Sequence, residues 1–141
     1  MPAKTHQKEL TFACDPRHLV DIRAAVQSMW SDRGLAERDG RLVTLAVDEA
    51  LASIIDHARG TNRQGDIKIS IDLDETRFRA VIDDFTNHCD SSGMMENELR
   101  AHLENERKHQ MGIFLMREVM DEVNYTYRKG FQNELTLVKF V

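Results

Sequence analysis

The sequence predicts an α+β fold, a two-layer sandwich in which helices pack against a mixed, mostly antiparallel sheet. Segments with the period-two alternation of half-buried strands stand beside segments with the 3.6-residue period of amphipathic helices. The strands are grouped and do not alternate one for one with helices, which favours this class over a parallel doubly wound sheet. With 141 residues, the chain is expected to form a single domain over 1–141, large enough to bury a core.

The first half of the chain contains two strand-forming and two helix-forming regions. Residues 8–14 alternate as a strand, and the helix that follows has Asp15 as its N-cap, Pro16 at its first position and Gly34 as its terminator. A second helix is expected over 39–58, closed by Gly60. Residues 66–73 and 77–83 alternate again, and the short stretch "DET" between them predicts an antiparallel β-hairpin.

The second half begins with a polar span, residues 84–110, that has no sustained apolar face. Such a span inside a compact domain is typical of a functional lid or a disordered loop. An apolar helix is expected over 111–123, followed by closing strands over 123–129 and 133–141. The total is roughly five strands and three or four helices.

Composition narrows the classes of partner. There are 19 basic against 24 acidic side chains and no basic run interleaved with aromatic residues, which argues against binding of nucleic acid. No apolar stretch approaches the ~20 residues of a membrane span, and the first ten residues lack the apolar segment of a signal peptide. We therefore expect a cytoplasmic protein with a protein or small-molecule partner. Cys14 and Cys89 are expected to be reduced thiols.

A column of polar side chains runs along the second predicted helix. Glu49, Ser53 and His57 are spaced by four, so they lie within roughly 80° of arc, beside Leu42 and Leu45. A functional role is one interpretation of such a column among core-forming residues. The alternatives are a capping or paired Glu49, a packing role for Ser53 and a hydrogen-bonded structural His57.

Three motifs carry a resemblance to a known family. The segments "LAVDEALASIIDHA", "VIDD" and "MGIFLMREVMDEVNYTYRKGFQNELTLVKFV" resemble the bacterial anti-sigma factor serine kinases, a branch of the ATPase superfamily that includes histidine kinases and gyrase. The similarity covers nearly the whole chain. It implies a histidine-kinase-like ATPase fold that holds ATP and Mg²⁺ between the helices and a lid. It also implies binding of a sigma factor, phosphorylation of a serine or threonine on an antagonist protein, or both.

The resemblance implies a role for individual residues. Glu49 matches the general base, and Ser53 stands where the family has the Asn that ligates magnesium. Asp83 matches the carboxylate that takes the adenine amino group, and Gly112 matches the turn that holds the phosphates. His57, one turn beyond Ser53, joins the cofactor-binding set.

Three motifs depart from the family pattern. Ser53 offers a shorter and weaker metal ligand than Asn. Phe85 stands where a Gly lets the nucleotide approach the backbone, and His109 and Gln110 replace glycines of the phosphate turn. Together these changes favour weakened nucleotide binding, so two hypotheses stay open: an anti-sigma kinase, and a pseudokinase that acts only by binding protein.

Two further possibilities concern the polar span. A homodimer is suggested by the resemblance and by Met94, Met95 and Met111. A metal-responsive protein is the third functional alternative, although the spacing matches no closed zinc pattern. Its candidate ligands are His88, Cys89, Asp90, His102 and His109.

Overall fold

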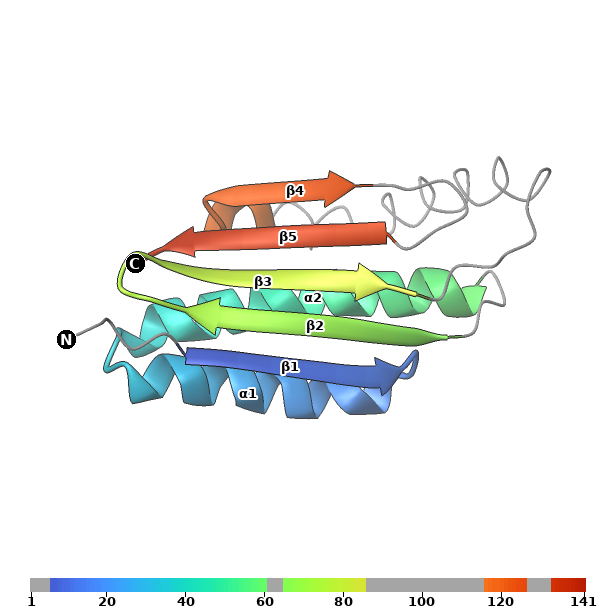
Figure 1. Cartoon of the computed structure of the whole chain (residues 1–141), viewed down its shortest axis with the longest axis horizontal. Helices are drawn as coiled ribbons and strands as arrows, with labels where there is room; N and C mark the ends of the chain where they lie inside the picture. The colour runs from blue at the N-terminus through green and yellow to red at the C-terminus, as the bar shows by residue number, and fades with distance from the viewer. Residues whose placement is uncertain (1–5, 61–64, 86–115, 127–132) are drawn as a thin grey trace.

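The computed structural model describes residues 6–60, 65–85, 116–126 and 133–141. Within these ranges five strands form one sheet in the order β1-β2-β3-β5-β4, and α1 and α2 lie on one face of it (Figure 1). Every strand pair described is antiparallel, so the two-layer α+β prediction is confirmed without the expected parallel component. The strands are β1 (His6–Ala13), β2 (Asp66–Leu73), β3 (Arg77–Asp84), β4 (Glu122–Thr126) and β5 (Asn133–Phe140).

The hairpin between β2 and β3 is held by the side chain of Asp74. Its Oδ1 accepts hydrogen bonds from the backbone N–H of Thr76 at 2.8 Å and of Arg77 at 2.9 Å, and from the Thr76 hydroxyl at 3.0 Å. These donors stabilise the ionised carboxylate, so the pKa of Asp74 lies below its usual value. The hairpin predicted from residues 66–83 is therefore confirmed.

The helices begin and end near the predicted residues. Asp15 accepts a hydrogen bond from the N–H of Arg17 at 2.9 Å and starts a 3₁₀ turn (Pro16–His18) that leads into α1 (Leu19–Asp32). Gly34 follows in the left-handed conformation, φ 66°, which suits a helix terminator. The second helix, α2 (Glu37–Gly60), extends two residues beyond the prediction at each end.

The predicted helix over 111–123 ends earlier than expected. Residues 116–119 are helical, but β4 already begins at Glu122, because Glu122 and Val123 pair with β5 opposite Val138 and Leu137. Residues 111–115 lie outside the described ranges. Among the residues described, no helix combines the length and apolar character that a membrane span requires.

The core fills the space between the sheet and the helices. Trp30 is buried at the end of α1, with its Nε1 donating to the carbonyl of Ala36 at 2.9 Å and its ring set edge-on to Phe78. Alternate residues of β2 and β3 point into this layer, as their period predicted. The fully buried strand residues include Ile67, Ile69, Ile71, Leu73, Phe78 and Ile82.

Candidate functional site

The helix α2 carries Glu49 and Ser53 on the side away from α1. On the opposite flank of α2, Asp48 pairs with Arg23 of α1, with Oδ1 and Nη1 3.1 Å apart. Consecutive helix residues differ by about 100°, so Glu49 turns away from α1 and Ser53 follows one turn later. Both side chains are half-buried. The structure therefore places the first two members of the predicted column on one flank of α2.

The other end of the site is formed by β3. This strand and α2 run in the same direction, so the later turns of α2 and the end of β3 lie at the same end of the molecule (Figure 1). At that end β3 carries two consecutive carboxylates, Asp83 and Asp84, which point to opposite faces of the sheet.

Asp84, and not Asp83, lies on the helix-covered face. Phe78, Ala80 and Ile82 are buried under the helices, and Asp84 continues their row with a side chain that is 6% exposed. Asp83 lies on the other face, in register with Lys68 of β2 and Glu134 of β5. The structure thus does not bring the predicted adenine residue Asp83 to the side of the sheet that α2 covers.

Phe85 also lies away from the helix-covered face. Its backbone N–H donates to the carbonyl of Asp66 at 3.0 Å, so pairing with β2 continues one residue beyond β3. Because side chains alternate along a strand, the Phe85 ring lies on the same face of the sheet as Asp83. Phe85 is 43% exposed. The Phe85 ring therefore does not lie on the face where α2 and the buried Asp84 are found.

Asp84 was missed by sequence reasoning, although a signal for it exists. In "RFRAVIDD" the apolar residues Phe78, Ala80 and Ile82 share one parity, and Asp84 has the same parity. A carboxylate that continues a buried row is unusual, because acidic side chains are rarely buried in folded proteins. That combination points to a functional group.

The remaining predicted site residues are only partly described. The backbone of His57 belongs to α2, but its side chain is not among those described. Gly112, the zinc alternative and the three methionines all fall within 86–115, outside the described ranges. The roles given to these residues stay predictions.

The side chains of the candidate site can be compared with what ATP and Mg²⁺ require of a binding site. Asp84 supplies a buried acceptor of the kind an exocyclic amino group needs. No group of three potential ligands from His, Cys, Asp and Glu gathers in the described part of the chain. Mg²⁺ bound with a nucleotide takes most of its ligands from phosphates and water, so a single protein oxygen such as the hydroxyl of Ser53 would fit an ion that the nucleotide carries.

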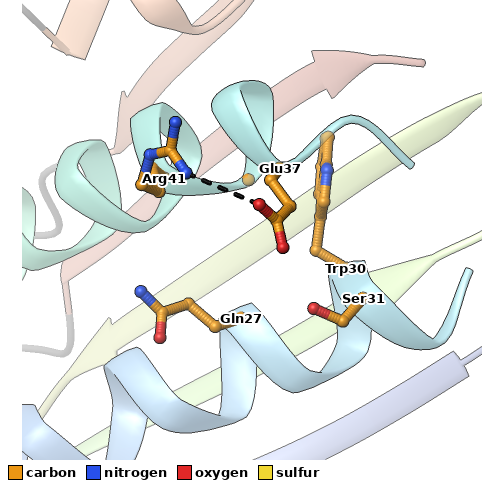
Figure 2. Close-up of a pocket in the computed structure, with 6 residues that line it drawn as sticks. Gln27, Trp30, Ser31, Glu37 and Arg41 are labelled. Atoms are coloured by element: carbon orange, nitrogen blue, oxygen red, sulfur yellow. Dashed lines mark ion pairs between the residues drawn. The ribbon is translucent and has the colours of Figure 1, made fainter. Parts of the chain in front are cut away.

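A separate pocket opens between the end of α1 and the start of α2 (Figure 2). Its volume is about 210 Å³, below the ~300 Å³ at which ligand pockets usually begin. Glu37 and Arg41 form an ion pair of 3.8 Å beside it, and both side chains are exposed. Glu37 precedes Glu49 by roughly 18 Å of helix, so this pocket is not part of the candidate site. The lining residues are Gln27, Trp30, Ser31, Glu37, Gly40 and Arg41.

Comparison with known proteins agrees with the fold. A family model described as a histidine kinase-like ATPase domain matches residues 12–139. The chain is also 22% identical over 132 residues to a protein named serine-protein kinase RsbW from Bacillus licheniformis, covering 91% of this chain and 82% of that protein. The resemblance inferred from the motifs is confirmed at the level of the family.

Proposed function

This chain belongs to the histidine kinase-like ATPase family, and from that premise we propose an anti-sigma-type regulator that binds a nucleotide between α2 and the end of β3. Its partners in this proposal are a sigma factor, the antagonist protein that opposes it, or both. The observation that carries the nucleotide part is the buried carboxylate of Asp84 on the helix-covered face. The likeness to a serine-protein kinase supports an antagonist serine or threonine as the phosphate acceptor.

Each residue has a distinct role in this proposal. Asp84 accepts a hydrogen bond from the adenine amino group, in place of Asp83. Glu49 accepts the proton of the attacking hydroxyl on the partner, as a general base does in phosphoryl transfer. When bound, Mg·ATP supplies the phosphoryl group and the charge that neutralises the phosphate oxygens. Ser53 lies one turn from Glu49 and offers its hydroxyl, directly or through water, to that ion.

A specific observation favours a second candidate, a pseudokinase that regulates by binding alone. Ser53 stands where the anti-sigma kinases that the chain resembles have an asparagine, and a hydroxyl is a weaker ligand for Mg²⁺ than an amide oxygen. The two candidates differ in one measurable respect. A kinase transfers radiolabelled phosphate from ATP to a serine of the antagonist, whereas a pseudokinase binds the same partner without transfer.

Nucleotide titration by calorimetry, with and without Mg²⁺, tests the site. We expect Asp84→Asn to weaken ATP affinity by about tenfold or more, because an amide replaces a charged acceptor. The neighbouring Asp83→Asn makes the same chemical change on the opposite face and is expected to leave ATP affinity within about twofold. Equal losses in the two variants, or no ATP binding by the wild type in either condition, would overturn the nucleotide proposal.

The metal and partner proposals need separate measurements. We expect Ser53→Asn to increase the gain in ATP affinity that Mg²⁺ produces, because the amide oxygen is the better ligand. Co-elution of the full chain with a purified sigma factor or antagonist tests the regulatory role. If neither candidate protein binds at micromolar concentrations, the anti-sigma assignment is wrong even where ATP binds.

A further inference from the structure

The outer ridge of α2 carries a line of four side chains. They are Arg38, Leu42, Leu45 and Glu49. Their spacings of four, three and four residues, at about 100° per residue, keep them within about 60° of arc. Val47 lies about 180° from Arg38 on the same helix and is 1% exposed, so the line is directed away from the sheet. We call the first three of these residues the α2 stripe.

The two leucines form the apolar centre of the α2 stripe. Leu42 is 38% exposed and Leu45 is 42% exposed, whereas Val43 and Val47 in the same turns are buried. An apolar patch rimmed by polar residues is typical of a surface that binds another protein. Here the patch is small, and it leads directly to Glu49, which lies one turn after Leu45.

Arg38 gives one end of the α2 stripe a positive charge. Within the ranges that the structure describes, Arg38 is exposed and takes part in no ion pair, whereas its neighbour Arg41 lies 3.8 Å from Glu37. A guanidinium with unoccupied donors binds a carboxylate well, because two parallel hydrogen bonds can form. The α2 stripe therefore combines an apolar centre with an end that selects an acidic group.

From these features we infer that the α2 stripe binds the segment of the partner protein that carries the acceptor serine or threonine. The inference deepens the proposed function and rests on it, because Glu49 is the group that meets the acceptor hydroxyl there. Glu49 is half-buried and in line with the stripe, so the docking surface is continuous with the candidate site. The occupant is an extended segment that has an apolar and an acidic side chain on one side of its acceptor.

Helix geometry sets where those two side chains lie along the partner. A rise of about 1.5 Å per residue places Leu45 about 6 Å and Leu42 about 10.5 Å from Glu49 along the axis. Arg38 is about 16.5 Å from Glu49 by the same measure. An extended segment advances about 3.3 Å per residue, so its apolar side chain lies about two or three residues from the acceptor and its acidic one about five.

Charge on the same ridge selects the direction of the segment. Asp56 is exposed, lies in line with Arg38 and is about 10.5 Å beyond Glu49 at the other end. An acidic residue of the partner would meet a like charge there, which opposes association. The acidic side chain of the segment therefore lies toward Arg38.

Selection from a peptide library on the full chain tests this inference. Each peptide has a serine at its centre and about six random residues on each side, enough to span the distance to Arg38. We expect the selected peptides to share an apolar residue about two or three positions from the serine, and Asp or Glu about five positions away on the same side. Fluorescence anisotropy then measures the Kd of a selected peptide, with and without Mg·ATP.

Two changes to the α2 stripe should weaken binding of that peptide. Leu42→Ser combined with Leu45→Ser removes the apolar centre and should raise the Kd by about tenfold or more. Arg38→Glu should also raise it by about tenfold, and a peptide with lysine in place of its acidic residue should restore binding to this variant. The matched controls Val20→Ser and Lys8→Glu change an exposed apolar residue of α1 and an exposed cation of β1, and should leave the Kd within about twofold.

Circular dichroism establishes that each variant is folded before it is compared. Selected peptides without the shared pattern, equal binding by the wild type and the leucine variant, or no peptide binding at all would overturn the inference. So would an altered sedimentation of the leucine variant with unchanged peptide binding, which assigns the stripe to a contact between copies. Asp84 lies under the helices and not on the ridge, so ATP affinity should stay within about twofold in every variant and reports separately on the nucleotide proposal.

Discussion

Replacing Gly40 by alanine tests how tightly the helical layer is packed around Trp30. A Cβ at residue 40 would lie 2.6 Å from Cδ1 of Trp30, 3.0 Å from its Cγ and 3.2 Å from its Nε1. Carbon atoms in contact normally keep about 3.5–4.0 Å, so the ring would have to move by roughly 1 Å. The indole resists this movement because its Nε1 donates a hydrogen bond to the carbonyl of Ala36 and its ring packs against Phe78, with 6.0 Å between the ring centroids.

Two opposing effects set the magnitude. Overpacking a core destabilises by about 1–3 kcal/mol. An alanine in a helix interior is favoured over glycine by about 1 kcal/mol, and by less at residue 40, which lies in the first turns of α2. The clash therefore exceeds the propensity gain, and we expect Gly40→Ala to lower the free energy of unfolding by about 1–2 kcal/mol.

Urea unfolding followed by tryptophan fluorescence measures this change, since Trp30 is the single tryptophan of the chain. The midpoint should fall with an unchanged slope, as expected when stability alone changes. Arg38 is exposed and lies in the same turn of α2. The difference in free energy of unfolding between Arg38→Ala and Arg38→Gly therefore measures the helix-propensity gain of alanine over glycine, which is subtracted from the Gly40→Ala result. A Gly40→Ala protein that unfolds at higher urea than the wild type, with the same tryptophan emission, would refute the packing argument.

Three further predictions concern stability. Leu51→Ala, at a fully buried position, should lower the free energy of unfolding by about 2–5 kcal/mol in urea, whereas Leu45→Ala, 42% exposed, should change it by no more than about 0.5 kcal/mol. Gly34→Ala meets no neighbour but strains a left-handed backbone, so a loss of about 1 kcal/mol is expected in the same assay. The folded-state pKa of Asp74 is depressed, so its stabilisation is complete above the unfolded value of 3.8 and disappears as pH falls through the folded pKa. Melting temperatures of wild type and Asp74→Ala should accordingly differ most at pH 6, and the difference should shrink as the pH falls below 3.8; a constant difference would contradict this reading.

Sequence reasoning succeeded where the signal is local. The Asp15 cap, the Gly34 terminator and the alternation on both sides of the hairpin depend on residues a few positions apart, and each was located to within about two residues. The predicted start of the last strand agrees with β5, which begins at Asn133. The end of the predicted helix over 111–123 was wrong because the apolar Val123 suits a helix and a strand equally, and pairing with β5 decided between them.

By itself, the sequence determined the elements, the family and the flank of α2 that carries Glu49 and Ser53, because helix geometry alone relates residues four apart. The parity of the apolar residues in β3 already assigns Asp84 to the buried row, but only the tertiary structure showed that the helices form the layer that covers this row. A strand alternates regardless of its surroundings, and the layer that covers one of its faces comes from distant parts of the chain. The same reason applies to the neighbours of β3 in the sheet, since the pairing of β3 with β5 joins residues that the whole polar span separates in the sequence.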